Sequence, residues 1–567
     1  MNNNIKLKKI PYGISDYKTL IEQKYIFVDK TKYLELLEEL GEPFIFFLRP
    51  RRFGKSLFIS ILEYYYDINS ENLFGNLFGN TYIGKNPTKK RNSYYVLRFN
   101  FSGINTSSKE ALLNGFTKKV LTGIKKFQTK YNISIDYQKE GLPSDIFEQF
   151  LTNIMECITG SIYVLIDEYD HFANELLSFQ TDMFEDTISK TGFVRKWYEV
   201  LKSGTDNGLI QKIFATGVSP VTLDSLTSGF NIAKNKTRDI RFNECLGFTE
   251  NEVKNVLLES LGNTIDVERE MPILKHYYNG YLFNKNGKNR IFNSDMILYY
   301  ASEYSASNTA PEQLIDTNVS SDYKKMAKLF TLKNKEQNYK ILNQIIQGIP
   351  QKTLITAEFS LSKNFSIDDF NSLLFYLGFL TINKANLNDV DLVVPNYVIK
   401  ELYFDFFGEV LNEESGYNID VSEIRNSIRN IAVEGNIKDF INIVSTTLNK
   451  LSNKDFIKFD EKYVKIIMLT YFMMSKIYYV KSEYEVDGFI DIALLPRPGV
   501  NAPYNAIFEV KYIKKEAFTK KLLEEKVKEA KEQIAKYILA PELAEMSNLL
   551  KWVLVFCKDK LVYEEKL

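Results

Sequence analysis

The sequence has few of the residues on which several common kinds of site depend. Its 567 residues include only 3 cysteines and 2 histidines. The cysteines, Cys157, Cys245 and Cys557, are far apart, so they offer neither a disulfide framework nor the spacing of a metal site. This pattern favours a reducing, cytoplasmic location. With so few histidines, histidine-based zinc chemistry and a Ser-His triad are poor explanations of the function.

The sequence also has no net charge and no apolar segment long enough to cross a membrane. The 72 Lys and Arg residues balance the 72 Asp and Glu residues, so no overall field favours nucleic acid and any basic surface must be local. The apolar run at residues 466–475 is too short to cross a bilayer and is typical of a core helix. The N-terminus lacks the apolar segment of a signal peptide. We therefore expect no membrane partner.

The chain is long enough for three or four domains. Residues 25–220 alternate short apolar runs with longer helical patterns, which predicts an α/β fold with a parallel sheet covered by helices. The expected strands of this sheet are residues 43–48, 94–101, 162–166 and 213–217.

The most informative segment is residues 49–56, Arg-Pro-Arg-Arg-Phe-Gly-Lys-Ser. It follows an apolar run and precedes a helical pattern, which is the setting of a phosphate-binding P-loop. Lys55 would reach the β- and γ-phosphates, and Ser56 would hold Mg²⁺. Arg49 stands where the common pattern has glycine. The three arginines of the loop would add charge near the phosphates, although solvated arginines are the simpler explanation. The segment predicts binding of a nucleotide, taken as ATP, by Arg52, Phe53, Gly54, Lys55, Ser56 and Leu57.

Two later strands end in polar residues. Asp167 fits the acid that orients the Mg²⁺ shell, and Glu168 fits the general base that polarises the attacking water. A buried strand ending in solvated acids is the simpler alternative, but the position after the Gly-Lys-Ser segment favours the functional interpretation. At the end of the strand at residues 213–217, Thr216 or Ser219 would sense the γ-phosphate; a plain turn explains both equally well.

These motifs, in this order, resemble those of the bacterial AAA-ATPase-like proteins. The resemblance covers about residues 8–310 and implies an ASCE-type P-loop core with a helical lid that begins near Phe248. In that family arginine is the usual residue at the position of Arg49. The matching segments are residues 25–31, 49–57, 164–170, 247–250 and 278–281. Members of the family commonly end in a PD-(D/E)XK nuclease domain.

The C-terminal region carries charged residues inside two apolar strands. Asp491 lies within residues 489–495, and Glu509 and Lys511 lie within residues 506–512. Residues two apart on a strand share a face, so Glu509 and Lys511 point the same way. A buried acid is costly unless it shares a cation, and the two acids with the Val510 carbonyl would supply oxygen ligands suited to Mg²⁺, with Mn²⁺ as the alternative. Lys511 would position or deprotonate the attacking water.

The resemblance to PD-(D/E)XK nucleases implies further residues. Glu483 matches the metal-binding acid on the first helix of such domains, with Glu485 a weaker candidate. Gln533 and Tyr537 match a helix motif near the scissile phosphate, which implies substrate binding. The alternative is an ordinary edge strand with solvated Glu and Lys residues.

Together these features predict an ATP-dependent nuclease with nucleic acid as its partner, a homo-oligomer as an open option, and, by analogy alone, a role in mobile-element or phage defence. Two alternatives are a nucleotide-dependent switch with an inactive nuclease domain and an NTPase that acts on protein partners. The predicted domains are a P-loop domain at residues 1–245, a helical lid at 246–320, a helical, winged-helix-like region at 321–430 and an α/β nuclease-like domain at 431–567.

Overall fold

The computed structural model describes residues 7–173, 192–220, 232–316, 326–331, 334–357, 365–416, 419–451, 460–485, 489–539 and 541–567. The chain forms two compact units. One comprises Met1–Asn308, Lys328–Ile341 and Gly348–Tyr397, and the other comprises Thr309–Ala327, Leu342–Gln347 and Val398–Leu567. The four-domain division made from the sequence stays a prediction.

The first unit is built on a parallel sheet with the strand order β2-β3-β4-β1-β5. Strand β4 lies between the P-loop strand β1 and the acid-bearing strand β3, which is the order that an ASCE core requires. The four strands expected from the sequence are confirmed, although β4 begins three residues earlier than expected. The strands are β1 (Phe44–Leu48), β2 (Tyr94–Asn100), β3 (Ser161–Asp167), β4 (Ile210–Gly217) and β5 (Lys234–Asn235).

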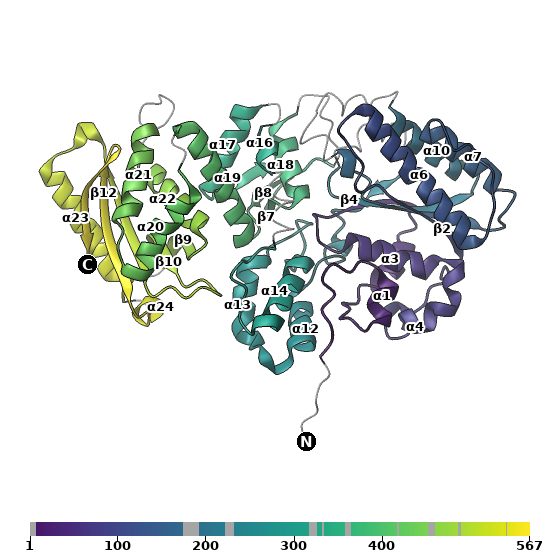
Figure 1. Cartoon of the computed structure of the whole chain (residues 1–567), viewed down its shortest axis with the longest axis horizontal. Helices are drawn as coiled ribbons and strands as arrows, with labels where there is room; N and C mark the ends of the chain where they lie inside the picture. The colour runs from purple at the N-terminus through teal and green to yellow at the C-terminus, as the bar shows by residue number, and fades with distance from the viewer. Residues whose placement is uncertain are drawn as a thin grey trace, which may run out of the picture. The chain divides into compact units, whose positions relative to one another are not determined.

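Helices cover both faces of this sheet, which explains why its strands are apolar almost throughout. Helices α1 (Tyr17–Glu22), α3 (Lys55–Tyr66) and α4 (Phe74–Phe78) lie on one side, and α6 (Lys109–Tyr131), α7 (Pro143–Ile154) and α10 (Phe193–Asp206) lie on the other (Figure 1). The buried Trp197 ring packs edge-on against Phe99 of β2, with ring centroids 5.1 Å apart. Two shorter helices are α2 (Lys32–Glu39) and α5 (Tyr82–Lys85).

Helices and a small antiparallel sheet follow the parallel sheet along the chain, and their assignment as a helical lid and a winged-helix-like element stays a prediction. Thr249 and Glu252 form a capping box at the start of the first lid helix. Further along the chain, a helix precedes a β-hairpin, and a third strand completes a small antiparallel sheet in the order β6-β8-β7. These elements are α12 (Glu250–Leu261), α13 (Val267–Tyr278), α14 (Ser294–Ser307), α16 (Met326–Phe330), α17 (Lys335–Ile346), β6 (Gln351–Thr353), α18 (Ile367–Leu377), β7 (Thr381–Asn386) and β8 (Asp389–Val393).

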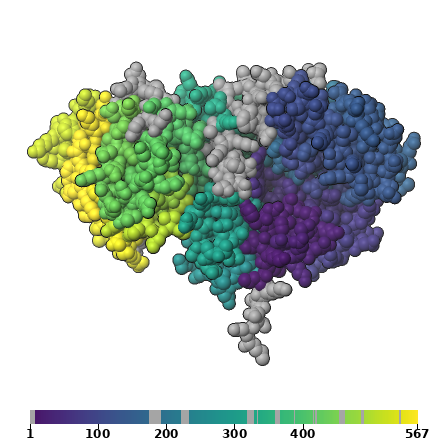
Figure 2. Space-filling view, in the orientation of Figure 1, coloured from purple at the N-terminus to yellow at the C-terminus, as the bar shows by residue number. Residues whose placement is uncertain are grey.

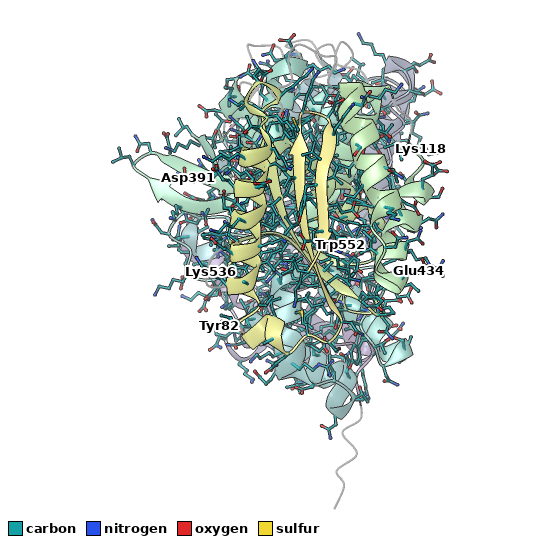
Figure 3. The ribbon with its side chains drawn as sticks, turned by 90° about the vertical axis from the view of Figure 1, so that its left-hand side faces the viewer. Tyr82, Lys118, Asp391, Glu434, Lys536 and Trp552 are labelled. Atoms are coloured by element: carbon teal, nitrogen blue, oxygen red, sulfur yellow. The ribbon has the colours of Figure 1, made fainter. Side chains whose placement is uncertain are left out.

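The second unit contains a mixed five-stranded sheet in the order β13-β12-β11-β10-β9, and helices precede and interrupt its strands. Figure 3 shows the helix that carries Lys536 (α23) and the helix that ends at Glu434 (α20) on opposite sides of the strand that carries Trp552 (β12). In Figure 2 the yellow C-terminal strands and the green helices of this unit form one continuous surface. The elements are α19 (Tyr397–Ser415), α20 (Val421–Glu434), α21 (Lys438–Leu451), α22 (Glu461–Ser475), β9 (Tyr479–Glu485), β10 (Phe489–Leu495), β11 (Asn505–Ile513), α23 (Lys520–Tyr537), α24 (Pro541–Ala544), β12 (Leu549–Cys557) and β13 (Lys560–Lys566).

Candidate functional site

The loop between β1 and α3 has the backbone of a phosphate-binding turn. Gly54 has a φ of 90°, a left-handed conformation that favours glycine, and helix α3 begins at the next residue. The Lys55 ammonium donates hydrogen bonds to the carbonyl oxygens of Arg49 (3.1 Å) and Pro50 (3.0 Å) across the loop. Burial lowers the pKa of Lys55, and the carboxylate of Glu168 acts in the opposite direction. If a phosphate group occupied the loop, the Lys55 ammonium could donate to its oxygens in place of these two carbonyls.

The structure brings Ser56 and Asp167 together, although they lie 111 positions apart in the sequence. Burial raises the pKa of Asp167, and the neighbouring Ser56 hydroxyl acts in the opposite direction. Asp167 is fully buried, and its Oδ1 has no hydrogen-bond partner in the described part of the chain. Its Oδ2 lies 3.7 Å from a guanidinium nitrogen of Arg98 and 3.5 Å from the Asn100 amide nitrogen.

Glu168 has a φ of 55°, an uncommon conformation for a residue other than glycine. Its Oε2 lies 2.9 Å from Nδ1 of His171. Burial alone would raise the pKa of Glu168, but His171 and the nearby Lys55 ammonium outweigh it and lower the pKa to about 2. The carboxylate is therefore ionised at neutral pH and can orient water as a weak base.

The hydroxyl predicted as a γ-phosphate sensor already has a partner in the sheet. Thr216 donates to the carbonyl of Phe47 at 2.7 Å, and its side chain is buried. The turn beyond β4 is held by Asp170, whose Oδ2 accepts from the backbone N–H groups of Val218 (3.0 Å) and Ser219 (2.7 Å). Asp170 is therefore a buried acid that holds the turn, and the sensor role of Thr216 stays a prediction.

Arg49 points into the protein rather than toward the loop's phosphate-binding face. Its guanidinium donates to the carbonyls of Leu48, Thr237 (2.8 Å) and Phe242 (2.6 Å). It also stacks on the rings of Phe47 and Phe283, at 4.4 and 4.0 Å from their centroids. The expectation that every loop arginine adds charge at the phosphates is wrong for Arg49, because this side chain is bound by backbone carbonyls behind the loop.

The lid holds the outer side of the P-loop through backbone hydrogen bonds. The carbonyl of Phe53 accepts from the N–H of Gly247 at 3.1 Å, and the carbonyl of Arg52 accepts from the Ser294 hydroxyl at 3.1 Å. Arg52, which has a φ of 69°, also forms an ion pair with Asp295 at 3.5 Å. The Phe53 ring packs edge-on against Tyr281. Arg52 and Phe53 thus connect the loop to the lid.

The small antiparallel sheet contacts the same region. The Thr381 hydroxyl of β7 accepts from the N–H of Leu282 at 2.8 Å, and the Asn396 amide donates to the carbonyl of Asn279 at 3.1 Å. At Gly280 an added Cβ would lie 1.9 Å from the Pro395 carbonyl oxygen, so only glycine fits. The segment at residues 278–281 therefore links the lid to the winged-helix-like element.

In the second unit, Asp491 of β10 and Glu509 of β11 face one another. The two strands are antiparallel and Ile492 lies opposite Phe508, so the next positions along the strands bring the two acids together. Asp491 Oδ2 accepts from the N–H of Val510 at 2.8 Å, and Glu509 Oε1 accepts from the Lys511 ammonium at 2.9 Å. The structure thus gathers three of the residues predicted to be catalytic.

Burial raises the pKa of both acids in this cluster. Burial and the charge of Asp491 raise the pKa of Glu509 to about 7, and burial raises the pKa of Asp491. The Oε2 atom of Glu509 is buried without a hydrogen-bond partner among the described residues. Such an oxygen beside a second carboxylate is suited to a divalent cation.

Helix α22 contributes two residues that the sequence interpretation missed. The Lys465 ammonium lies 2.5 Å from Asp491 Oδ1 and 2.7 Å from Glu461 Oε1. The sequence pattern that could have identified these two residues is a Glu and a Lys four positions apart at the start of a core helix, because residues at this spacing lie on one face of the helix. Burial alone would lower the pKa of Lys511, but the charges of Glu509, Asp491 and, to a smaller extent, Glu461 outweigh it and raise this pKa.

The helix position assigned to Glu483 is wrong. Glu483 lies on strand β9, has a φ of 49° and is exposed, whereas Glu461 lies on α22, the helix that precedes β9, β10 and β11. The Glu485 side chain lies outside the described residues. No cluster of three or more His, Cys, Asp or Glu side chains suited to a metal ion is found in the described ranges, so Glu483 does not complete one with Asp491 and Glu509.

Gln533 and Tyr537 lie on α23, four residues apart and hence on one face of the helix. The Tyr537 hydroxyl donates to the carbonyl of Phe489 at 2.7 Å, and burial with the charge of Glu509 raises its pKa to about 12. Gln533 Oε1 is buried without a partner in the described part of the chain. On the same helix, Glu529 lies 3.4 Å from the Lys511 ammonium, so α23 borders the acid cluster.

Comparison with protein families gives two matches. Residues 11–227 match the model described as "Predicted AAA-ATPase", and residues 459–566 match the PD-(D/E)XK nuclease superfamily. The chain joins an AAA-ATPase-like domain to a PD-(D/E)XK nuclease-superfamily domain. The first match contains the P-loop and both β3 acids, and the second begins just before Glu461.

Two individual proteins are similar to parts of this chain. An Azotobacter chroococcum mcd 1 protein described as "Uncharacterized protein in vnfD 5'region" is 27% identical over 281 residues, which are 48% of this chain and 48% of that protein. The matched region is therefore about half the length of that curated relative. A solved structure, the Walker-type ATPase of Pyrococcus abyssi, is 12% identical and aligns with 70% of this chain and 99% of its own, with a TM-score of 0.35.

Both domains have donor sets that fit a divalent cation. In the AAA-ATPase-like domain these are the Ser56 hydroxyl and the partnerless Asp167 Oδ1, and in the nuclease-superfamily domain they are Asp491 and the partnerless Glu509 Oε2. None of the described helices is both long enough and apolar enough to cross a membrane.

Proposed function

We propose that this protein is an ATP-dependent nuclease that hydrolyses nucleic-acid phosphodiester bonds. The observation that carries the proposal is the cluster of Asp491, Glu509 and Lys511 on two neighbouring strands, in a region that matches the nuclease superfamily. An ordinary solvated edge strand would not bury two carboxylates and a lysine together, with exposures of 9%, 1% and 5% respectively.

The roles follow from the contacts. Asp491, Glu509 and the Val510 carbonyl would hold Mg²⁺ or Mn²⁺, which supplies charge stabilisation at phosphorus and a more acidic bound water. Lys511 is fixed by Glu509 and orients the attacking water or holds its proton. Gln533 and Tyr537 on α23 border this cluster and would contact the nucleic-acid backbone.

The AAA-ATPase-like domain would bind ATP·Mg²⁺. Lys55 exchanges its two loop carbonyls for phosphate oxygens, and Ser56 and Asp167 hold the ion. Glu168, ionised because its pKa is about 2, orients the water that attacks the γ-phosphate.

A cleavage screen tests the nuclease. Single- and double-stranded DNA and RNA are incubated with the full chain in Mg²⁺ or Mn²⁺, with and without ATP. We expect cleavage that is lost in Asp491→Ala and Lys511→Ala and kept in Glu434→Ala, which removes an exposed acid from the same unit. Thermal melting of each variant separates lost chemistry from lost folding. Cleavage without ATP would contradict the proposed ATP dependence but not the nuclease activity. Cleavage that is kept in Asp491→Ala would contradict the assigned site.

One observation favours a second candidate, a nucleotide-dependent switch whose nuclease domain binds without cutting. Lys465 already places a positive charge on Asp491, where a metal ion would otherwise bind. For this candidate we expect oligonucleotide binding that depends on nucleotide, with no cleavage of any substrate in either metal.

The biological role that we propose is defence against mobile elements or phage, by analogy with nuclease fusions alone. Phage plaque counts on cells with the wild-type protein and with Asp491→Ala test it. Equal counts for the two would contradict a defence role that depends on cleavage.

A further inference from the structure

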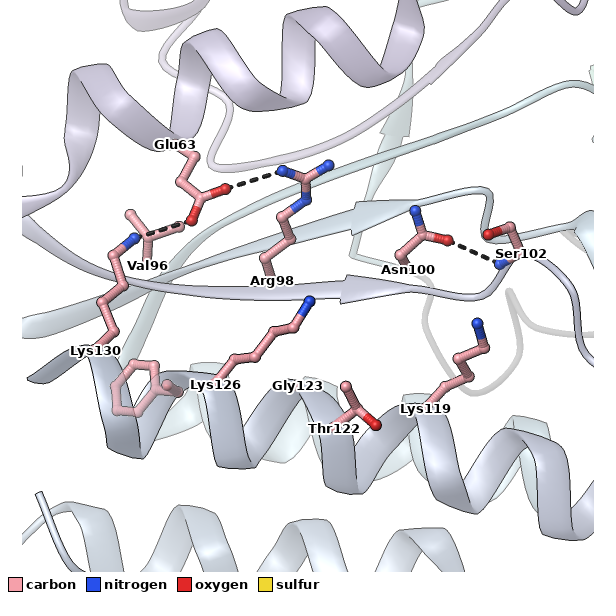
Figure 4. Close-up of a pocket in the computed structure, with 11 residues that line it drawn as sticks. Glu63, Val96, Arg98, Asn100, Ser102, Lys119, Thr122, Gly123, Lys126 and Lys130 are labelled. Carbon is pink, nitrogen blue, oxygen red and sulfur yellow. Dashed lines mark hydrogen bonds and ion pairs between the residues drawn. The ribbon is translucent and has the colours of Figure 1, made fainter. Parts of the chain in front are cut away.

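A polar cavity lies in the AAA-ATPase-like domain, beside the outermost strand of its sheet. Its volume is about 470 Å³, and it is bordered by β2, α6 and Glu63 of α3 (Figure 4). Val96, Arg98 and Asn100 of β2 line it, at every second position and hence on one face of the strand, and Ser102 lines it just beyond the end of β2. None of these residues lies in the motif segments identified from the sequence.

The opposite wall is a row of lysines on one face of α6. Lys119, Lys126 and Lys130 all line the cavity. They are spaced by seven and four residues, which are intervals that return to the same side of a helix. At 1.5 Å per residue the row extends over about 16 Å. Figure 4 shows the Lys119 and Lys126 ammonium groups directed toward the strand.

Half of the four cations of the lining carry no ion pair within the described ranges. Glu63 is the single acid of the lining, and it pairs with Arg98 (3.0 Å) and Lys130 (2.9 Å). No ion pair of Lys119 or Lys126 is found among the described residues. Lys130 also pairs with Asp67 at 2.5 Å, and Arg98 also lies 3.7 Å from Asp167. Lys119 and Lys126 are therefore the cations of the lining without an ion pair among the described residues, in a cavity that also offers Asn100, Ser102 and Thr122 as hydrogen-bonding groups.

The cavity is connected to the nucleotide site through Arg98. One guanidinium nitrogen of Arg98 binds Glu63, and the other lies 3.7 Å from Asp167 Oδ2. The neighbouring Asn100 amide nitrogen lies 3.5 Å from the same oxygen. An anion that attracts Arg98 would weaken its interaction with the acid that is expected to hold Mg²⁺.

We propose that this basic groove binds the phosphate backbone of one strand of nucleic acid, and that this binding acts on the ATP site through Arg98. The inference deepens the proposed function, because it names a second contact for the same substrate class. The lysine row is longer than the triphosphate of one nucleotide and suits several successive phosphates. Phe127 is the single aromatic side chain of the lining, so the contacts are with the backbone and carry no sequence preference.

The binding test compares two double variants of the same helix. Lys119→Ala/Lys126→Ala removes the two unneutralised lysines of the groove. Lys118→Ala/Lys125→Ala removes the same charge one position earlier, on an exposed face of α6 outside the cavity lining. Fluorescence anisotropy with labelled oligothymidylate and oligoadenylate of about 20 nucleotides, in EDTA to prevent cleavage, gives affinity at several salt concentrations.

We expect the groove variant to bind both oligonucleotides more weakly, by a similar factor. Each lost phosphate contact lowers the slope of log affinity against log salt by about 0.7, so the slope should fall by about 1.4 for the groove variant. Equal affinities and slopes for the two double variants would overturn the proposal. The proposal would also be overturned if the groove variant lost binding to inorganic triphosphate but kept its affinity for the oligonucleotides. That result would assign the groove to a small ligand.

The coupling is tested by ATP turnover. Unlabelled oligothymidylate should stimulate turnover several-fold in the wild type and in the Lys118→Ala/Lys125→Ala control, and not in the groove variant. Oligonucleotide binding that leaves ATP turnover unchanged in all three proteins would overturn the link through Arg98. These assays do not require cleavage, so an inactive nuclease domain would contradict the proposed function and leave this inference standing.

Discussion

The Lys465 ammonium lies 2.5 Å from Asp491 Oδ1, on the helix that precedes the two strands of the acid cluster. A lysine thus neutralises one of two facing carboxylates, where a divalent cation is expected to bind. Because the Lys465–Asp491 ion pair and a metal ion would compete for the same carboxylate, we expect the stability of the second unit to depend on metal binding.

Replacing Lys465 should reveal this competition. Lys465→Gln leaves a buried carboxylate without its cation, so we expect the free energy of unfolding in metal-free buffer to fall by about 1–3 kcal/mol. Titration calorimetry should show tighter binding of Mn²⁺, which restores the stability. Lys462→Gln, an exposed lysine of the same helix, is the control and should change neither quantity. Weaker Mn²⁺ binding in Lys465→Gln would mean that the lysine assists the metal.

The raised pKa of Glu509 predicts a pH dependence. Burial and the charge of Asp491 raise this pKa to about 7, so the folded protein keeps a proton that the unfolded chain has already released. The stability from this group is therefore present below about pH 4.5 and is lost as the pH rises through about 7. Urea unfolding without metal should show a smaller loss of stability between pH 5 and pH 8 in Glu509→Gln than in the wild type. Identical pH profiles would show that Glu509 titrates normally.

Arg49 should be essential for the loop although glycine is the common residue at its position. Arg49→Gly removes hydrogen bonds to the Thr237 and Phe242 carbonyls and the stacking on two rings. We expect a loss of about 3 kcal/mol or more in the free energy of unfolding. Arg51→Gly, two positions further in the same loop, is the control and should cost less. A variant at position 49 as stable as the wild type would contradict the structural role.

Gly280 should tolerate no side chain. Gly280→Ala places a Cβ 1.9 Å from the Pro395 carbonyl oxygen, in addition to the left-handed strain of a φ of 118°. Gly348 has a φ of 72° with no atom near an added Cβ, so Gly348→Ala reports the strain alone, about 1–2 kcal/mol. We expect a lower melting temperature and weaker ATP binding for Gly280→Ala than for Gly348→Ala. Equal melting temperatures would show that the backbone moves aside freely.

The parts of the fold that rest on local patterns could be predicted. Continuous apolar runs gave β1 to β4, and the strand–loop–helix context placed Lys55, Ser56 and Asp167 at one edge of the sheet, where Ser56 contacts Asp167. In the second unit, the two-residue period placed Glu509 and Lys511 on one face, where they form an ion pair.

The remaining features depend on contacts between distant residues. The partners of Arg49 at Thr237 and Phe242 follow it by 188 and 193 positions, so no window of sequence contains them. Glu483 was placed on a helix by the resemblance to PD-(D/E)XK nucleases. The run Ile477-Tyr478-Tyr479-Val480, rich in β-branched and aromatic residues, was a strand signal just before it.

The hydrogen bonds from Gly247 and Ser294 to the carbonyls of Phe53 and Arg52 have a kinetic consequence. A loop whose outward carbonyls are already bound has little conformational freedom left to lose when phosphate arrives. Rigid sites of this kind differ from flexible ones mainly in how slowly the ligand departs. We therefore expect the residence time of the nucleotide to depend on the lid, because breaking the hydrogen bonds from Gly247 and Ser294 would free the loop to rearrange and release phosphate.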